Sequence, residues 1–272
     1  MELTRREFLK MAGFASAGVV VAASAGSLLA GCSPVAKSAD GSLKGKQLAM
    51  LIVPSRCEEG CDECIRACHL NHNVPNLANK KHEIKWIWQT EFQHAFPEYM
   101  ENELLKERME GVPFLVLCNH CANPPCVRAC PTKATFKRED GAVMMDYHRC
   151  IGCRFCVAAC PYGARSFNFE DPRNGLDKSK INPNFPTRTK GVVEKCNFCT
   201  ELNLYGGDLP YCVQACIKKK GSQEASALVF GDLADEHSVI HTALEHLQKE
   251  EKLIPLRRKE IAGTQPKVYY LV

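Results

Sequence analysis

Continuous apolar runs and turn residues predict short strands in this chain. The stretch LAMLIVP at 48–54 is apolar throughout and predicts a buried strand, and KGVVEKC at 190–196 predicts another. Two further short segments of strand-like composition flank Asp140 and Gly141. Because Asp-Gly suits the tight turn of a hairpin, we expect these two segments to pair.

Helical spacing of apolar residues predicts helices elsewhere. One helix is expected over 235–250, with Asp235 as its cap, because its apolar residues recur at intervals of three and four. A charged amphipathic helix is expected around 99–110. The apolar residues of the first helix are Val239, Ile240, Ala243, Leu244 and Leu247.

The amino terminus has the pattern of an export signal. Arg5 and Arg6 stand in TRREFLK at 4–10, which resembles the twin-arginine motif, and an apolar stretch rich in Ala, Gly and Ser follows at 11–30. The stretch LLAGC at 28–32 resembles the lipobox at which bacterial lipoproteins are cleaved and diacylated on the cysteine.

These motifs predict how the chain is exported and anchored. We expect residues 1–31 to be a twin-arginine signal peptide, Cys32 to be lipidated, and 32–47 to be a small, polar tether. The alternative is an uncleaved signal anchor in which Cys32 is an unmodified thiol.

Composition excludes some functions and draws attention to cysteine. The chain has 272 residues, 35 basic and 31 acidic, with a net charge of +4 and no long run of either sign. Nucleic-acid binding is therefore not indicated, since it needs a concentrated basic patch. The unusual number is 17 cysteines.

Apart from Cys32, the cysteines form four quartets, and each quartet ends in a C-x-x-x-C pair. They are Cys57, Cys61, Cys64 and Cys68; Cys118, Cys121, Cys126 and Cys130; Cys150, Cys153, Cys156 and Cys160; and Cys196, Cys199, Cys212 and Cys216. A loop with short gaps can wrap three corners of an iron-sulfur cube, and a fourth cysteine one helical turn further on serves a neighbouring cluster. Four quartets then predict four clusters.

Three other uses of cysteine fit this spacing less well. Zinc sites explain C-x-x-C pairs but not triple thiols followed by a fourth. Disulfides suit an exported protein, although closely spaced pairs are poor structural staples. A c-type haem needs C-x-x-C-H, and the nearest match, CIRACH at 64–69, has three residues between its thiols.

A repeat within the chain predicts the fold class. CPTKATF at 130–136 matches CPYGARSF at 160–167, with the expected hairpin between them, which is the pattern of a dicluster ferredoxin-like α+β domain. The flanking quartets predict a second such domain, so that the two are interleaved. We expect an inner domain at 118–189 and an outer domain at 48–117 plus 190–272, with a large insert at 69–116 and a C-terminal helical extension.

The cysteine pattern, with GVVEKCNFC, VFGDL and GTQPKVYYL, resembles the four-cluster iron-sulfur subunits of the DMSO-reductase type. Within this family, the export signal, HNVPN, IKWIW and RCIGCRFCVAACPYGARSFNF are most similar to the DsrO-type subunits of the DsrMKJOP membrane complex. The sequence departs from the pattern in the three-residue gap between Cys57 and Cys61, and it has His69 and Ile217 where the inner quartets have proline.

The resemblance implies four [4Fe-4S] clusters with crosswise ligands, which we number as sets. Set 1 is Cys57, Cys61, Cys64 and Cys216; set 2 is Cys68, Cys196, Cys199 and Cys212; set 3 is Cys118, Cys121, Cys126 and Cys160; set 4 is Cys130, Cys150, Cys153 and Cys156.

The resemblance also implies a function as an electron carrier, and the sequence contains no motif of a catalytic site. The implied partners are an integral membrane quinone-interacting subunit of the NrfD or DsrP type and a periplasmic multihaem cytochrome c of the DsrJ type, on the extracytoplasmic side of the membrane. The alternative is the electron-transfer subunit of an exported molybdopterin oxidoreductase. A third hypothesis is a cluster-bearing scaffold or redox sensor.

Several residues near the quartets are candidates for adjusting cluster potentials. They are His120, His148, Lys195, Arg128 and Arg149, because positive charge stabilises a reduced cluster. The alternative for each is an ordinary surface or hydrogen-bonding role, which also holds for His94. Trp86 and Trp88 are expected to be core or interface anchors rather than electron relays.

Overall fold

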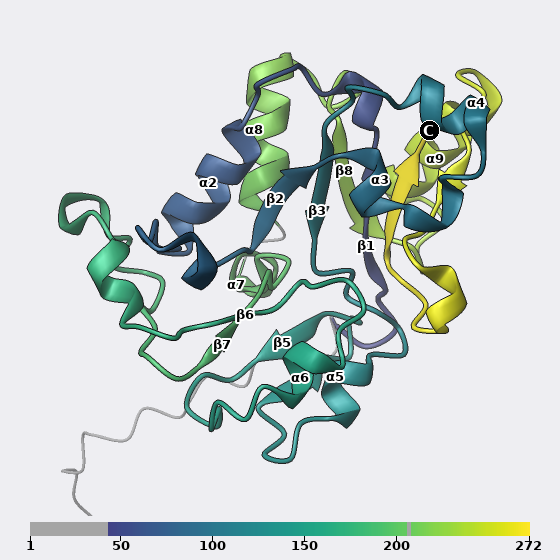
Figure 1. Ribbon diagram of the computed structural model, residues 1–272. Coiled ribbons are helices and arrows are strands. Elements are labelled where there is room, and N and C mark those ends of the chain that lie inside the picture. Colours follow the sequence, from purple (N-terminus) through teal and green to yellow (C-terminus); the bar gives the residue numbers. More distant parts are fainter. Residues whose placement is uncertain (1–42, 206–207) are drawn as a thin grey trace, which may run out of the picture. The chain divides into compact units, whose positions relative to one another are not determined.

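The computed structural model describes residues 43–205 and 208–272, and every structural statement below concerns these residues (Figure 1). The expected signal peptide, lipobox and Cys32 lie outside them. Of the expected tether, only 43–47 is described, and Gln47 is tied to the folded chain because its N–H donates to Oδ1 of Asp232 at 2.7 Å. The fold is a mixture of α and β elements, as expected.

The main sheet has four strands in the order β8-β1-β10-β9. Strand β1 (Leu48–Ile52) pairs in parallel with β10 (Val268–Leu271) and antiparallel with β8 (Leu228–Asp232). Strand β9 (Pro255–Leu256) completes the edge beside β10. The buried strand predicted at 48–54 is therefore confirmed.

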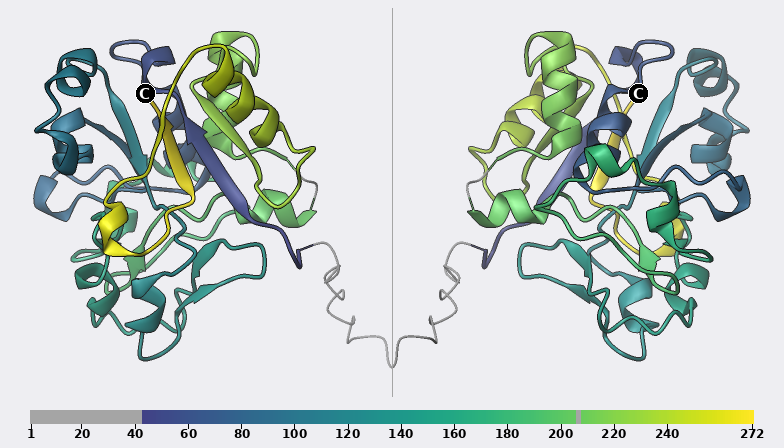
Figure 2. Two further views of the ribbon diagram at one scale, coloured as in Figure 1. Left: turned by 90° about the vertical axis from the view of Figure 1, so that its right-hand side faces the viewer. Right: turned by 90° about the vertical axis from the view of Figure 1, so that its left-hand side faces the viewer.

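Strand β1 is apolar throughout because both of its faces are covered. Met50 and Ile52 belong to the larger core, which includes the 69–116 insert. Ala49 and Leu51 face a second core beneath helix α9 (Val239–Lys249). Figure 2 shows α9 and the insert on opposite sides of β1.

Helix α9 confirms the helix expected over 235–250 but begins later than predicted. Its N-cap residue is Ser238, and the Asp235 carboxylate instead accepts a hydrogen bond from the His237 N–H at 2.9 Å. The Ser238 N–H donates to the Asp235 carbonyl, so that Asp235 opens a turn before the helix. The predicted cap at Asp235 was wrong because the Asp235 carboxylate accepts a hydrogen bond within this turn, before the helix begins.

Two pairs of helices carry six of the sixteen cysteines in the quartets. Helices α2 (Glu63–Asn71) and α8 (Tyr211–Lys220) pack side by side (Figure 1). Helices α5 (Pro125–Arg128) and α6 (Phe155–Ala158) are much shorter and also contact each other. Helix α7 (Thr200–Tyr205) follows the C-x-x-C pair of the last quartet. Residues four apart on a helix share a face, so each long helix presents two cysteines to its surroundings.

The predicted hairpin is confirmed. Strands β4 (Thr135–Lys137) and β5 (Val143–Met145) pair antiparallel, with Phe136 opposite Met144. Gly141 has a φ of +84°, which glycine adopts without strain. The strand expected at 190–196 is also present as β7 (Val193–Glu194), and it pairs with β6 (Ser166–Phe167) from the repeated motif.

The insert folds onto the larger core through its own small sheet. Strands β2 (Ile87–Thr90) and β3 (Phe114–Leu117) pair antiparallel, and α3 (Phe92–Ala95) and α4 (Glu103–Arg108) lie between them in sequence. The helix expected around 99–110 begins only at Glu103, because Asn102 caps it by accepting from the Leu105 N–H at 3.1 Å.

Short 3-10 helices complete the described residues, at Pro54–Arg56, Lys80–His82, Pro97–Tyr99, Pro172–Gly175, Lys178–Lys180 and Glu260–Ala262. None of the helices described here is both long and apolar enough to cross a membrane.

Candidate iron-sulfur sites

Set 1 lies where α2 and α8 meet the loop after β1. Cys57 and Cys61 come from that loop, Cys64 from α2 and Cys216 from α8, and all four line one cavity. Burial raises the pKa of the Cys64 thiol to about 12, and repulsion from the other three thiolates adds to it. The structure therefore brings these four sulfurs together.

Set 2 is the most deeply enclosed group. All four of its cysteines are buried. Burial raises the pKa of Cys68 well above its ordinary value, followed by repulsion from Cys196, Cys199 and Cys212. Phe198 and Cys199 have positive φ angles of 59° and 50°, which turn the C-x-x-C loop sharply before α7.

Set 3 surrounds a cavity beside α5 and the loop that begins at Cys118. Cys118, Cys121, Cys126 and Cys160 all line it. Burial raises the pKa of Cys121 to about 12, and the first of the thiols that add to this is Cys118. The intervening His120 has a φ of +40°, so the loop between Cys118 and Cys121 is also sharply turned.

Set 4 surrounds a cavity beside α6, lined by Cys130, Cys150, Cys153 and Cys156. Burial acts to raise the pKa of Cys130, but hydrogen bonds from Thr135, Thr132 and Ala134 outweigh it and leave the pKa below its ordinary value. The Thr135 N–H lies 3.4 Å from the Cys130 Sγ. This set is thus supplied with hydrogen-bond donors.

The four sets follow one another in a row. Cys64 of set 1 contributes to the raised pKa of Cys68 in set 2, where burial is the larger cause. Burial and then repulsion from Cys118 of set 3 raise the pKa of Cys196 in set 2 to about 12. Burial, with a smaller contribution from Cys126 of set 3, raises the pKa of Cys156 in set 4. Sets 1 and 4 are therefore the two ends.

These groups fit iron-sulfur clusters by the chemistry of their donors. All sixteen cysteines of the described residues are free of disulfides. Four thiolates held together in a buried site repel one another, and bound iron would relieve that repulsion. Four convergent sulfurs are also the ligand number of a [4Fe-4S] cluster.

The structure separates the predicted tuning residues into buried and exposed ones. Lys195 is buried, and its Nζ donates to the carbonyls of Val143 and Cys196. The buried His120 ring stacks on the Phe198 ring, with ring centroids 3.6 Å apart. Burial is the main cause that holds the pKa of His120 well below its ordinary value, and the charges of Lys195 and Arg165 act in the same direction. The His120 Nδ1 accepts a hydrogen bond from the Val143 N–H at 3.0 Å, as a neutral imidazole can.

The remaining tuning candidates lie on the surface. His148 is exposed, Arg128 donates to Oδ1 of Asn123 at 2.6 Å, and Arg149 pairs with Asp146 at 3.2 Å. His94 is exposed as well. Their exposure and these contacts fit the alternative given for these residues, which is an ordinary surface or hydrogen-bonding role.

The two tryptophans pack as anchors. Trp86 is fully buried, donates from Nε1 to Oε2 of Glu194 at 3.0 Å and stacks on His72 with ring centroids 4.6 Å apart. Trp88 is partly buried and packs against the same core.

The sequence did not single out Arg165, which is 5% exposed. Its Nη1 donates to Oγ1 of Thr135 at 3.1 Å. The guanidinium charge also acts on the thiols of Cys126 and Cys156, which belong to sets 3 and 4, and lowers the pKa of Cys156 against the larger effect of burial. The only signal of Arg165 in the sequence is that it follows the quartet ending at Cys160.

His72 was also missed. Its Nε2 lies 2.8 Å from Oε1 of Glu201, and its Nδ1 lies 3.6 Å from the Cys68 Sγ. The ligand atoms of His72, Cys199 and Glu201 fall within 4.8 Å of one another, as a metal site would require. Because Cys199 belongs to set 2 and Glu201 holds the imidazole, we interpret this group as support for set 2.

Comparison with known proteins identifies iron-sulfur domains in this chain. Two families described as 4Fe-4S dicluster domains match the sequence, one at 111–175 and one at 149–220. The Hdr-like menaquinol oxidoreductase iron-sulfur subunit 1 of Archaeoglobus fulgidus is 38% identical, over 98% of this chain and 97% of its own length. A subunit of the tetrathionate reductase of Salmonella typhimurium is 34% identical, over 100% of this chain and 89% of its own length.

A third relative is the menaquinone reductase iron-sulfur cluster-binding subunit of Nitratidesulfovibrio vulgaris, which is 33% identical over 82% of this chain and 87% of its own length. The expectation of an electron-transfer subunit rather than a catalytic one is confirmed by these relatives. This chain therefore belongs to the family of iron-sulfur electron-transfer subunits of oxidoreductase complexes, which bind [4Fe-4S] clusters through dicluster domains.

Proposed function

We propose that sets 1 to 4 each hold one [4Fe-4S] cluster and that the protein carries single electrons along this row. The observation that carries the proposal is the convergence of the sixteen cysteines into four groups, with neighbouring thiols between consecutive groups. Each cluster supplies one-electron chemistry, and the chain supplies the thiolates and the surroundings that set its potential.

The proposed complex joins the carrier to a membrane quinone-interacting subunit of the NrfD or DsrP type and to a periplasmic multihaem cytochrome c of the DsrJ type, as in DsrMKJOP-like sulfur metabolism. Two relatives support the quinone partner, since one is named as a subunit of a menaquinol oxidoreductase and another as a subunit of a menaquinone reductase. The twin-arginine motif and the lipobox support an extracytoplasmic, lipid-anchored location.

A second candidate is the electron-transfer subunit of an exported molybdopterin oxidoreductase. The similarity to subunits of tetrathionate reductase and polysulfide reductase favours it. In that case a partner subunit carries out the reaction, and the row of clusters supplies or removes its electrons.

The composition of the intact membrane complex separates the two candidates. We expect haem c without molybdenum for the first proposal and molybdenum for the second. Iron and acid-labile sulfide should each be about sixteen per chain, and menaquinol should reduce the clusters through the complex. A complex that holds zinc without sulfide, or clusters that menaquinol cannot reduce, would contradict electron carriage.

The membrane anchor is tested by the intact mass of the mature protein. We expect a chain that begins at Cys32 and carries a diacylglyceryl group. A mature chain that begins after Cys32 without lipid would refute the lipoprotein proposal and leave the cluster proposal unaffected.

A further inference from the structure

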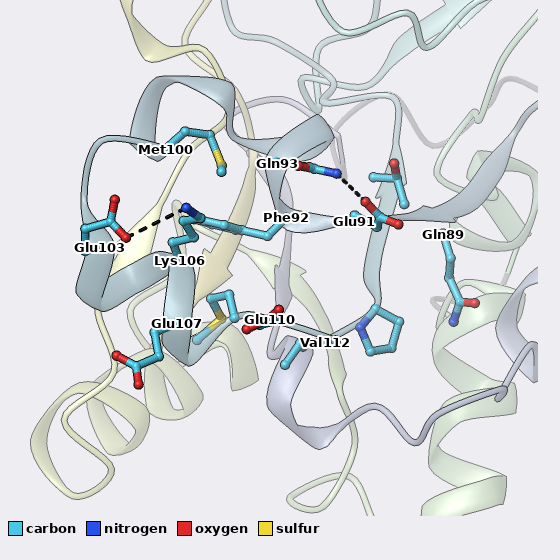
Figure 3. Close-up of a pocket in the computed structure, with 14 residues that line it drawn as sticks. Gln89, Glu91, Phe92, Gln93, Met100, Glu103, Lys106, Glu107, Glu110 and Val112 are labelled. Atoms are coloured by element: carbon cyan, nitrogen blue, oxygen red, sulfur yellow. Dashed lines mark hydrogen bonds and ion pairs between the residues drawn. The ribbon is translucent and has the colours of Figure 1, made fainter.

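An open groove of about 1030 Å³ lies on the surface of the insert, beside set 1. Its floor contains apolar side chains, among them Phe92, Met109 and Val112. Figure 3 shows Gln89 at one edge of the groove and Glu103 and Glu107 at the other. Strand β2, α3, α4 and the turn before β3 together form it.

The rim of the groove has a charge opposite to that of the whole chain. Four carboxylates line it, from Glu91, Glu103, Glu107 and Glu110, against one ammonium from Lys106. The local charge is therefore 1 − 4 = −3, whereas the chain as a whole carries +4. Lys106 lies 3.7 Å from Glu103, and because Glu103 is 81% exposed, this pair contributes little to stability. The acidic rim is thus left available to an outside cation.

The groove reaches the ligands of set 1 through one side chain. Gln89 lines the groove, and its Nε2 donates to the Cys61 carbonyl at 2.8 Å and lies 3.9 Å from the Cys57 Sγ. Pro113 lines both the groove and the cavity of set 1. A partner bound in the groove would therefore be separated by a single residue from set 1, which is one end of the row.

We propose that this groove, which we call the acidic groove, docks a lysine- or arginine-rich segment of the redox partner that exchanges electrons at set 1. Such a segment suits both parts of the groove, since the aliphatic stems of lysine and arginine pack on an apolar floor while their charged ends reach the rim. Complementary charge speeds association and fixes orientation. The inference rests on the proposed function, because the partner must meet a cluster at set 1.

The test uses mitochondrial cytochrome c as a basic probe and the purified protein with its clusters in place. The protein is reduced with dithionite, separated from the excess reductant under anaerobic conditions and mixed with the ferric probe, so that one electron leaves the protein for each haem that becomes ferrous. The groove variant combines Glu103→Gln, Glu107→Gln and Glu110→Gln. The matched control combines Glu139→Gln, Glu236→Gln and Glu250→Gln, which removes the same charge from exposed positions outside the groove.

We expect the second-order rate at low ionic strength to fall about tenfold in the groove variant and less than about twofold in the control. The affinity of the probe should fall in parallel, and high salt should abolish the difference. Both variants should keep their iron, sulfide and reduction potentials, which shows that the row itself is intact. A probe whose lysines have been acetylated should react equally slowly with all three proteins.

Two results would overturn the docking proposal. One is an equal loss of rate in the groove variant and the control, which would make the effect one of net charge alone. The other is sedimentation showing that the wild-type protein self-associates and that the groove variant does not, which would make the groove a contact between copies. Failure of the proposed function is distinguishable, because a wild-type protein without reducible clusters would transfer no electron to either form of the probe.

Discussion

Sets 1 and 4 lie at opposite ends of the row and are built alike but surrounded differently. In each, two cysteines come from a loop and one from the helix that follows it, while the fourth lies within α8 at set 1 and two residues after α5 at set 4. The helices at set 1 are nine and ten residues long, whereas both helices at set 4 have four residues. The same ligand pattern is therefore supported by helix packing at one end and by loops at the other.

The charges around the two ends also differ. At set 4, the buried Arg165 and donors such as the Thr135 N–H face the sulfurs. At set 1, burial and then neighbouring thiols raise the pKa of Cys57, and the Glu58 carboxylate adds a smaller contribution in the same direction. A reduced cluster carries one more negative charge, which donors and cations stabilise and carboxylates disfavour. We infer that set 4 has the higher reduction potential of the two.

The largest expected effect comes from removing one ligand at each end. Cys153→Ala and Cys61→Ala should each lower the iron content from about sixteen to about twelve atoms per chain. Because set 4 is the more readily reduced, Cys153→Ala should remove the more positive signal in a redox titration followed by electron paramagnetic resonance, and Cys61→Ala the more negative one. Loss of the same signal from both variants would contradict the comparison.

Alanine substitutions at two matched glycines test how closely the cysteine-bearing loops of sets 4 and 1 are packed. An added Cβ at Gly152, in the loop of set 4, would overlap the Gly191 carbonyl and approach Phe167, whereas at Gly60, in the loop of set 1, it meets open space. Both have positive φ, +70° and +71°. Gly60→Ala should lower the free energy of unfolding by about 1 kcal/mol, because alanine is strained at a positive φ. Gly152→Ala should lower it by roughly a further 1 to 3 kcal/mol, because the added Cβ overpacks the loop.

Thermal unfolding of the two cluster-containing variants, together with their iron content, measures this difference. Gly152→Ala should also lose iron from set 4 alone, because its loop supplies Cys150 and Cys153. Equal midpoints for the two variants would show that the packing of Gly152 against Gly191 does not support set 4.

Local spacing in the sequence was enough to predict the parts of the fold that depend on neighbours along the chain. Strand β1 follows from five consecutive apolar residues, and the β4-β5 hairpin follows from Asp140 and Gly141. The four quartets follow from gaps that match the wrapping of a cluster. The start of α9 was missed because the turn at Asp235 competes locally with the helix cap.

Features that join distant segments could not be predicted in this way. Arg165 meets Thr135 across 30 residues, and His72 meets Glu201 across 129. The acidic groove brings β2 and α3 together with α4 and the turn before β3, in an insert for which only the amphipathic helix had been predicted. Such contacts depend on tertiary packing, for which a single sequence carries no periodic signal. The division into an inner and an outer domain stays a prediction.

Arg165 provides the sharper electrostatic test of set 4. Arg165→Gln removes a buried cation beside Cys126 and Cys156 and should lower the potentials of sets 3 and 4 by on the order of 50 mV, which is about 1.2 kcal/mol for one electron. Arg165→Lys keeps the charge and should recover part of the shift. Potentiometric titration at fixed pH measures both.

The matched controls for this variant are Arg128→Gln and Arg149→Gln, since both residues are basic, near the quartets and exposed. Their potentials should stay close to those of the wild type, because solvent screens an exposed charge. A shift as large as that of Arg165→Gln in either control would mean that the potential reports net charge rather than the buried guanidinium.

The smallest expected effect is at the other end, where Lys220 is the nearest counterpart of Arg165. Its Nζ lies 2.8 Å from Oε1 of Glu58, and it acts to lower the pKa of Cys57 against the larger effect of burial. Because Glu58 already neutralises Lys220 and is 53% exposed, Lys220→Met should lower the potential of set 1 by about 20 mV or less. Lys218→Met, on the exposed side of the same helix, is the control and should leave the potential unchanged. If Lys220→Met instead matched Arg165→Gln, the two ends would be electrostatically equivalent, and the higher potential of set 4 would have to come from its hydrogen-bond donors alone.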